Sequence, residues 1–323
     1  MLIVLATSPR VAPGLLSWPA WAALRSAAVV LAPAGHPQLP ALDAAGIACR
    51  LASEPHASAA GPDGMPDEVT VWLAPPGSDP QVPSGAQLIE GSADLPGAHF
   101  IDLVATMDRL RVQCPWDARQ THASLAPHLL EESYEAVEAL ESGDPRALRE
   151  ELGDVLMQPV FHARIAAERD DGTGYTIDDV ADGIVAKLVR RHPHVFGDVT
   201  VSGADEVKAN WDEIKKKEKT DLAERSGVPA AGQASPSALD SVPFGQPALA
   251  LAAQLQRRAT RAGVPEDLAR LDGPAAAPGD DLGVELFRLV ARARALDLDP
   301  EAELRAAARR YRDLVRAWER QER

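Results

Sequence analysis

The most informative part of the sequence is LEESYEAVEALESGDPRALREELGDVL, at residues 130–156, in which nine residues are acidic. It is rich in Glu, Ala, Leu and Arg, which favour helices. Residues 142–145 interrupt this pattern with a helix stop, an N-cap at Asp144 and Pro145 at the start of the next helix. Because the break is so short, we expect two helices that are antiparallel neighbours.

Each predicted helix carries two carboxylates on one face, beside a separate apolar stripe. Glu132 and Glu135 are three residues apart, as are Glu151 and Asp154, so each pair lies on one side of its helix. The stripes, which we expect to form the core between the helices, are Leu125, Leu129, Leu130, Val137 and Leu140, and then Leu148, Leu152, Val155 and Leu156. Packing on these stripes would bring the four carboxylates together at one edge of the core.

Four adjacent carboxylates repel one another and are costly to desolvate without a counter-charge. A hard divalent cation removes that cost, and Mg²⁺ takes oxygen ligands while keeping waters and substrate phosphates in its shell. The alternative is a solvated acidic face with i,i+4 ion pairs to Arg146 and Arg149. The residue pattern by itself leaves both interpretations open.

Composition limits the other function classes. The chain has 323 residues, of which 46% are hydrophobic and 25% charged, an ordinary globular mixture. The formal net charge of −15 argues against a nucleic-acid partner. The apolar runs are too short for a membrane span, and the N-terminus lacks the basic region of a signal peptide. With only Cys49 and Cys114 as cysteines, we expect a cytoplasmic protein with no membrane partner.

Composition divides the chain into a small α/β segment, a helical domain, a linker and a second helical unit, predicted at 1–95, 96–222, 223–243 and 244–323. In the first region, short apolar runs at 2–6, 28–32 and 69–73 predict buried strands. The linker is rich in Pro, Gly, Ser and Ala. The predicted fold class is therefore mainly α, with a small α/β segment at the N-terminus.

The second helical unit is similar to an eroded copy of the first. The segment DLGVELFRLVARARA, which starts at Asp281, aligns with ELGDVLMQPVFHARI, which starts at Glu151. Val284 then stands where the first unit has Asp154, and Pro and Gly interrupt the region where the partner helix should lie. We therefore predict one active unit per chain, with the C-terminal helices serving packing or assembly.

The ordered motifs of residues 98–220 resemble the MazG family of nucleoside triphosphate pyrophosphohydrolases. The acidic residues of the two helices match that family's EExxE…ExxD motif, with Glu131, Glu132, Glu135, Glu151 and Asp154. Further stretches that resemble MazG sequences are CPWD at 114–117 with Gln120-Thr121, RRHPHVF at 190–196, and Trp211 with Ile214-Lys215. Several motifs in the same order make this resemblance much more specific than an acidic pair of helices.

The resemblance implies an all-α NTP pyrophosphatase bundle, a hydrolase of phosphoric anhydrides that converts NTP or dNTP to NMP or dNMP and pyrophosphate in nucleotide-pool house-cleaning. It implies one or two Mg²⁺ ions per site, with Mn²⁺ as a substitute, and the ligands Glu132, Glu135, Glu151 and Asp154. Glu131 would orient or deprotonate the attacking water, or is an exposed structural residue. A homodimer or higher homo-oligomer is also implied. The alternative function is a non-catalytic helical interaction module.

Candidate substrate contacts lie outside the acidic motif. Lys187, Arg190 and Arg191 fall in the last turns of a helix predicted from residue 177, where they either bind phosphate or complement the helix dipole. The family resemblance favours phosphate contact for Lys187 and Arg191. Trp116 either stacks on the nucleobase or packs in the core.

The N-terminal segment resembles the start of a tetrapyrrole methylase-like domain, through LLSWPAWAALRSAAVVLAPAGHPQLPAL at 15–42 and VTVWLAPPGSDP at 69–80. Its first turn, TSPR at 7–10, lacks the glycines that let a cofactor approach the backbone closely. The segment is also too short for a two-lobed methylase. We expect a degenerate remnant that does not bind S-adenosylmethionine.

Overall fold

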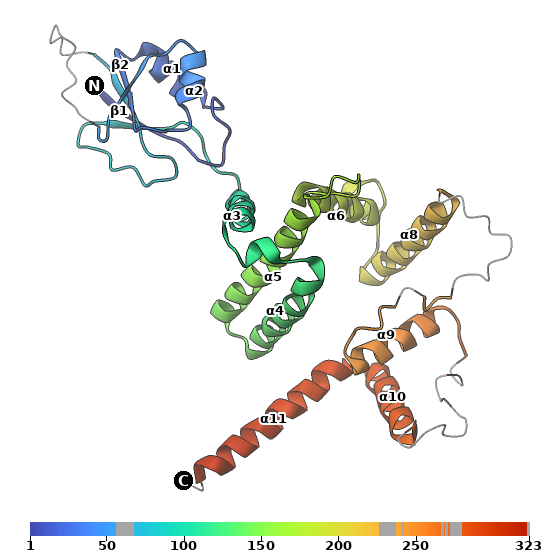
Figure 1. Cartoon of the computed structure of the whole chain (residues 1–323). Coiled ribbons are helices and arrows are strands. Elements are labelled where there is room, and N and C mark those ends of the chain that lie inside the picture. The colour runs from blue at the N-terminus through green and yellow to red at the C-terminus, as the bar shows by residue number, and fades with distance from the viewer. Residues whose placement is uncertain are drawn as a thin grey trace. The chain divides into compact units, whose positions relative to one another are not determined.

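The computed structural model describes residues 1–55, 68–225, 237–240, 242–265, 268, 271 and 280–321. They form two compact units, Met1–Ile214 and Lys215–Arg323 (Figure 1). Helices predominate in both, and the first unit also contains a small parallel sheet, so the mainly α prediction is confirmed. Within the described ranges, no helix is long and apolar enough to cross a lipid bilayer.

The N-terminal sheet has five parallel strands in the order β3-β2-β4-β1-β5. They are β1 (Leu2–Ala6), β2 (Val29–Ala32), β3 (Cys49–Leu51), β4 (Thr70–Leu73) and β5 (Gln87–Glu90). The strands predicted at 2–6, 28–32 and 69–73 are confirmed as β1, β2 and β4, whose central residues are buried. Sequence reasoning missed β3 and β5 because they are edge strands with mostly exposed side chains and no apolar run.

Two short helices, α1 (Trp18–Ser26) and α2 (Leu39–Ala44), cover one face of this sheet (Figure 1). Leu24 of α1 and Leu42 of α2 pack with Leu5 and Leu73 of the sheet, and all four side chains are fully buried. The segment is connected to the helical part through Arg10, whose guanidinium pairs with Asp94 and with Asp102.

The rest of the first unit is helical. Its elements are α3 (His99–Gln113), the 3-10 helix η1 (Asp117–Arg119), α4 (His122–Ser142), α5 (Pro145–Ala166), α6 (Ile177–Arg191), α7 (Pro193–Phe196) and α8 (Ala204–Arg225), which continues into the second unit. Helices α4 and α5 pack side by side along their length, and α3 packs on α5 (Figure 1). The predicted pair of antiparallel helices is thus present.

Local capping fixes the turn between α4 and α5. Helix α4 ends at Gly143, whose φ of 73° lies in the left-handed region that favours glycine. The Asp144 carboxylate then accepts hydrogen bonds from the backbone N–H groups of Arg146 and Ala147, with Pro145 in the first turn of α5. Asp144 as the N-cap and Pro145 as the first helical residue, both expected from the sequence, are therefore confirmed. Because they fix the start of α5, they also fix the positions of Glu151 and Asp154 along it.

The buried core of the helical part differs from the predicted apolar stripes. It consists of Met107 on α3, Leu125 on α4, and Val160 and Phe161 on α5. Of the stripe residues, Leu125 is fully buried, but exposed side chains are found at Leu129, Leu130, Leu140, Leu152 and Leu156. The expected core was therefore wrong for these five leucines, whereas Val137, Leu148 and Val155 are partly buried. Helix α3 covers the C-terminal half of α5, and the buried side chains lie where these two helices meet α4.

The second unit contains α9 (Ala248–Arg261), α10 (Asp280–Ala295) and α11 (Pro300–Gln321). Because α8 ends at Arg225, the first three residues of the predicted linker, 223–225, are helical instead. Residues 226–236 and Ser241 of that linker lie outside the described residues, as does most of the Pro- and Gly-containing stretch at 266–279. The four-region division of the chain stays a prediction.

The core around Phe161 predicts a large and specific loss of stability. Phe161 is 2% exposed, whereas Phe196 is 61% exposed. Replacing Phe161 with Ala leaves a cavity and should cost about 3–5 kcal/mol of unfolding free energy, measured by urea denaturation. The same truncation at Phe196 should cost less than about 1 kcal/mol. Equal losses in the two variants would contradict this assignment of the core.

Candidate active site

Three carboxylates from α4 and α5 converge in the first unit. Glu132 on α4 and Glu151 and Asp154 on α5 each offer one oxygen, and these three oxygens lie within 4.8 Å of one another. All three side chains are partly buried. Oxygen ligands lie about 2.0–2.1 Å from a bound Mg²⁺, so two ligands on opposite sides are about 4.2 Å apart. The observed spacing is therefore within a small side-chain adjustment of a metal-binding geometry.

Partial burial, followed by mutual repulsion, governs the electrostatics of this group. Partial burial raises the pKa of Glu132, and the charges of Asp154, Glu135, Glu131 and Glu151 raise it further. Partial burial likewise raises the pKa of Glu151, with added repulsion from Glu135 and Asp154 and then Glu150. The site thus concentrates negative charge in a place where ionisation is unfavourable.

No basic side chain compensates this charge within the described part of the chain. The sequence left open an acidic face paired with Arg146 and Arg149, but neither arginine forms an ion pair there. Arg146 uses its backbone N–H to satisfy the Asp144 cap. The alternative of i,i+4 pairing is therefore not supported among the described residues, and the cluster is a possible site for a metal ion.

The remaining acidic residues of the motif are placed differently. Glu135 is exposed and lies outside the group of three, although its charge acts on both Glu132 and Glu151. Glu131 is also exposed, and its carboxylate lies 3.7 Å from Nδ1 of His128. The structure therefore brings together three of the four predicted metal ligands, with Glu135 beside them.

The predicted substrate contacts lie on other elements. Lys187 and Arg190 are exposed at the C-terminal end of α6, and Arg191 is half-buried. Trp116, in the turn before η1, is 48% exposed. Its ring centroid lies 6.5 Å from that of Phe161, so Trp116 packs on the core and still presents much of its surface to solvent.

Sequence reasoning missed one contact among these groups. The guanidinium of Arg191 lies 5.4 Å from the ring centre of Trp211 on α8, a distance suited to a cation–π interaction. The two residues are on different helices, so no periodicity joins them. Trp211 belongs to one of the sequence motifs, but the sequence carries no signal that it contacts Arg191.

The comparisons with known proteins cover the segment that contains this site. The family model described as the MazG nucleotide pyrophosphohydrolase domain matches residues 120–196, which contain α4, α5 and α6. A protein of Mycolicibacterium smegmatis named nucleoside triphosphate pyrophosphohydrolase is 41% identical, over 75% of this chain and 68% of that protein.

Two further relatives extend the match. A Thermotoga maritima protein named nucleoside triphosphate pyrophosphohydrolase/pyrophosphatase MazG is 38% identical, over 67% of this chain and 83% of its own length. An uncharacterized protein of Streptomyces cacaoi is 48% identical, over 72% of this chain and 88% of its own length. The paired acidic helices thus belong to a hydrolase domain of the phosphoric-anhydride class. The chain is a member of the MazG nucleotide pyrophosphohydrolase family, which confirms the resemblance drawn from its motifs.

The raised pKa of Glu132 predicts how stability depends on pH. In the folded chain this carboxyl binds its proton more tightly than in the unfolded chain, so ionisation destabilises the fold. The penalty is absent below the unfolded pKa of about 4.3 and grows as pH rises through the raised folded value. In metal-free buffer, Glu132→Gln should therefore raise the melting temperature at pH 7–8 and have little effect at pH 4.

The matched control for this prediction is Asp170→Asn, since Asp170 is exposed and outside the cluster. That variant should show no pH-dependent gain in melting temperature. Adding Mg²⁺ at pH 7.5 should stabilise the wild type more than Glu132→Gln, because the variant has lost one ligand. A Glu132→Gln gain of the same size at pH 4 and pH 8 would contradict the raised pKa of Glu132.

Proposed function

We propose that this chain is a Mg²⁺-dependent nucleoside triphosphate pyrophosphohydrolase, which converts NTP or dNTP to NMP or dNMP and pyrophosphate as a nucleotide-pool house-cleaning enzyme. The observation that carries the proposal is the group of carboxylates at Glu132, Glu151 and Asp154, close together and without a basic partner in the described structure. The printed names of the Mycolicibacterium and Thermotoga relatives support a triphosphate substrate.

The donor set fits a hard divalent cation. Glu132, Glu151 and Asp154 would hold it. The charge of Glu135 acts on both Glu132 and Glu151, so Glu135 would be the fourth ligand. Carboxylate oxygens alone, with no sulfur or imidazole ligand in the group, favour Mg²⁺ and also accept Mn²⁺. When bound, Mg²⁺ neutralises phosphate oxygens and lowers the pKa of a coordinated water. One or two ions per site are compatible with four carboxylates.

The other residues bind and orient the substrate in this proposal. Lys187 and Arg191 bind phosphate oxygens, with Arg190 beside them, and the Trp211 ring holds the Arg191 guanidinium in position. The exposed surface of Trp116 stacks on the nucleobase, an interaction that tolerates any base. Glu131 adjoins Glu132 and is exposed, so its carboxylate orients the attacking water and accepts its proton. Attack at the α-phosphorus then releases pyrophosphate.

The proposed partner of the chain is a second copy of itself. Helix α6 has no buried residue, yet it carries exposed apolar side chains at Val180, Ile184, Val185, Leu188 and Val189. Together with the exposed leucines of α4 and α5, these residues form apolar surface that assembly would bury. We expect a homodimer or higher oligomer in the cytoplasm, without nucleic acid as a partner because of the net charge of −15. Light scattering that gave a mass near 34.3 kDa would contradict this.

Loss of single carboxylates tests the metal site. Glu132→Ala, Glu135→Ala, Glu151→Ala and Asp154→Ala should each lower turnover more than about a hundredfold, because each removes a ligand from the cation. Glu141→Ala, which removes an exposed acid near the end of α4, should leave turnover within about twofold. The assay measures NMP and pyrophosphate against NDP and inorganic phosphate, over a panel of NTPs and dNTPs.

Two outcomes would overturn the proposal. If two of the ligand variants retained near wild-type rates at saturating Mg²⁺, the assigned ligands would be wrong. If the wild type released no pyrophosphate from any triphosphate with Mg²⁺ or Mn²⁺, the alternative of a non-catalytic helical interaction module would be favoured.

The eroded second unit gives a separate prediction. Asp281 aligns with Glu151, but Val284 offers no oxygen where the first unit has Asp154. A lone carboxylate holds Mg²⁺ weakly, because the ion needs several oxygens to offset its dehydration. Asp281→Ala should therefore leave both turnover and Mg²⁺ requirement unchanged, whereas Glu151→Ala abolishes turnover. A large loss of activity in a folded Asp281→Ala protein would show that the second unit is catalytic.

A further inference from the structure

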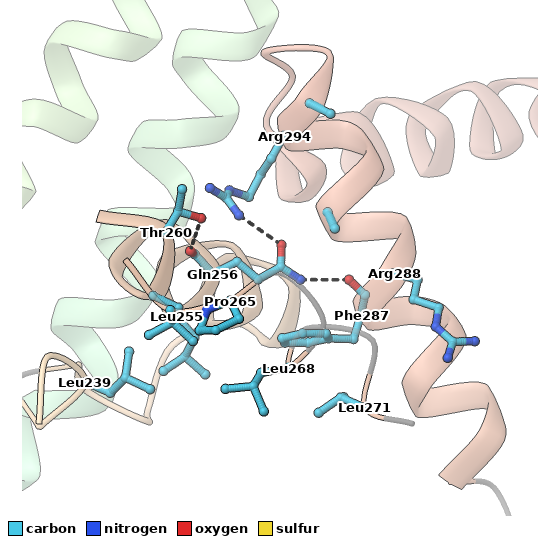
Figure 2. A pocket seen from close by; sticks show the side chains of 14 residues that line it. Leu239, Leu255, Gln256, Thr260, Pro265, Leu268, Leu271, Phe287, Arg288 and Arg294 are labelled. Atoms are coloured by element: carbon cyan, nitrogen blue, oxygen red, sulfur yellow. Dashed lines mark hydrogen bonds between the residues drawn. The ribbon is translucent and has the colours of Figure 1, made fainter. Parts of the chain in front are cut away.

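A cavity of about 910 Å³ lies in the second unit, lined by residues of α9 and α10 and of the segments beside them (Figure 2). Its volume falls within the range of about 300–1,000 Å³ typical of small-molecule sites. The walls are mainly apolar, with Leu239, Leu255, Val264, Pro265, Leu268 and Phe287. Ala259, Ala291 and Ala295 also line it, and their small side chains leave the space open.

A buried amide fixes the polar part of this cavity. Gln256 on α9 is 5% exposed, and its Nε2 donates a hydrogen bond of 2.8 Å to the backbone oxygen of Phe287 on α10. Its Oε1 accepts a hydrogen bond of 3.2 Å from Nη1 of Arg294 (Figure 2). Both ends of the amide are therefore used, and Gln256 holds the guanidinium of Arg294 against the cavity wall.

The polar part of the described lining includes a guanidinium. Arg294 lines the cavity, and the described lining contains no Asp or Glu. Among the described residues, no carboxylate forms an ion pair with Arg294. Burial lowers the pKa of Arg294, and repulsion from Arg257 lowers it further. Since Gln256 occupies only one guanidinium N–H, Arg294 has donors left for an anion.

We propose that this cavity binds a small amphipathic anion, with its apolar body against Leu255 and Phe287 and its anionic head hydrogen-bonded to Arg294. Burial of the ligand's apolar surface against the cavity walls favours binding of its body. The guanidinium favours a head group that is a carboxylate or a similar oxyanion. The site belongs to the second unit and uses none of the residues assigned to triphosphate hydrolysis.

Calorimetric titration of the full-length chain tests the site with three probes of equal chain length, namely octanoate, 1-octanol and octylammonium at pH 7.5. We expect one saturable octanoate site per chain. The neutral alcohol should bind about tenfold more weakly, and octylammonium should not bind, because repulsion from Arg294 opposes it. Octanol binding as tightly as octanoate, or no saturable binding of octanoate, would overturn the proposal.

Arg294→Gln removes the proposed head-group contact and should weaken octanoate binding about tenfold while leaving octanol binding unchanged. The matched control is Arg292→Gln, since Arg292 is exposed on the same helix and does not line the cavity. This control should bind octanoate like the wild type. Equal octanoate affinity in the two variants would refute the role of Arg294.

A second variant tests the cavity itself. Ala291→Phe places a ring in the space that the apolar body would occupy and should abolish binding of both octanoate and octanol, with Arg294 unchanged. Circular dichroism and thermal melting establish that each variant is folded. If Ala291→Phe does not fold, the comparison of Arg294→Gln with Arg292→Gln decides alone. Undiminished binding to folded Ala291→Phe would show that the ligand adheres to the exposed apolar helix faces instead.

Discussion

Helices α4 and α5 hold the carboxylates of Glu132, Glu151 and Asp154 close together in partly buried positions, where both burial and mutual repulsion oppose their ionisation. The packing of α4 against α5 holds their oxygens within 4.8 Å of one another and raises the pKa of Glu132 and Glu151. Folding must overcome this unfavourable term with apolar burial elsewhere. The buried side chains around Phe161 lie farther along α5 than Glu151 and Asp154. The acidic residues are therefore not part of the apolar core and could bind a ligand.

The geometry of the site follows from very local sequence features. Gly143 ends α4 in a left-handed conformation, and Asp144 caps α5, so the register of one acidic pair against the other is set within two residues. An i,i+3 spacing then places each pair on one helix face. For this reason the two helices, their turn and the convergence of Glu132 with Asp154 were predictable from the sequence. Glu135 lies beyond the group of three, and helix periodicity alone could not distinguish it from Glu132.

Apart from the exposed edge strands β3 and β5, the features that sequence reasoning missed depend on contacts between distant segments. The apolar stripe that includes Leu129 and Leu152 looked like a core, but helix α3, from an earlier segment, determines which part of α5 is buried. The contact of Arg191 with Trp211 joins two helices, and the hydrogen bond of Gln256 with Arg294 joins residues 38 positions apart. Periodicity reports which side of one helix is apolar, but it does not report what covers that side.

The apolar surface left on the helical domain connects the proposed assembly to the proposed chemistry. Leu129, Leu152 and Leu156 are exposed on the same two helices that carry the carboxylates. Burying this surface in an oligomer would further exclude water from the acidic group, which makes unpaired charge there more costly. A cation that neutralises the group would offset that cost and so favour the assembled state. By linkage, assembly would then strengthen cation binding by the same factor. In the proposed oligomer, burial of the exposed leucines and cation binding by the paired acids would therefore favour each other.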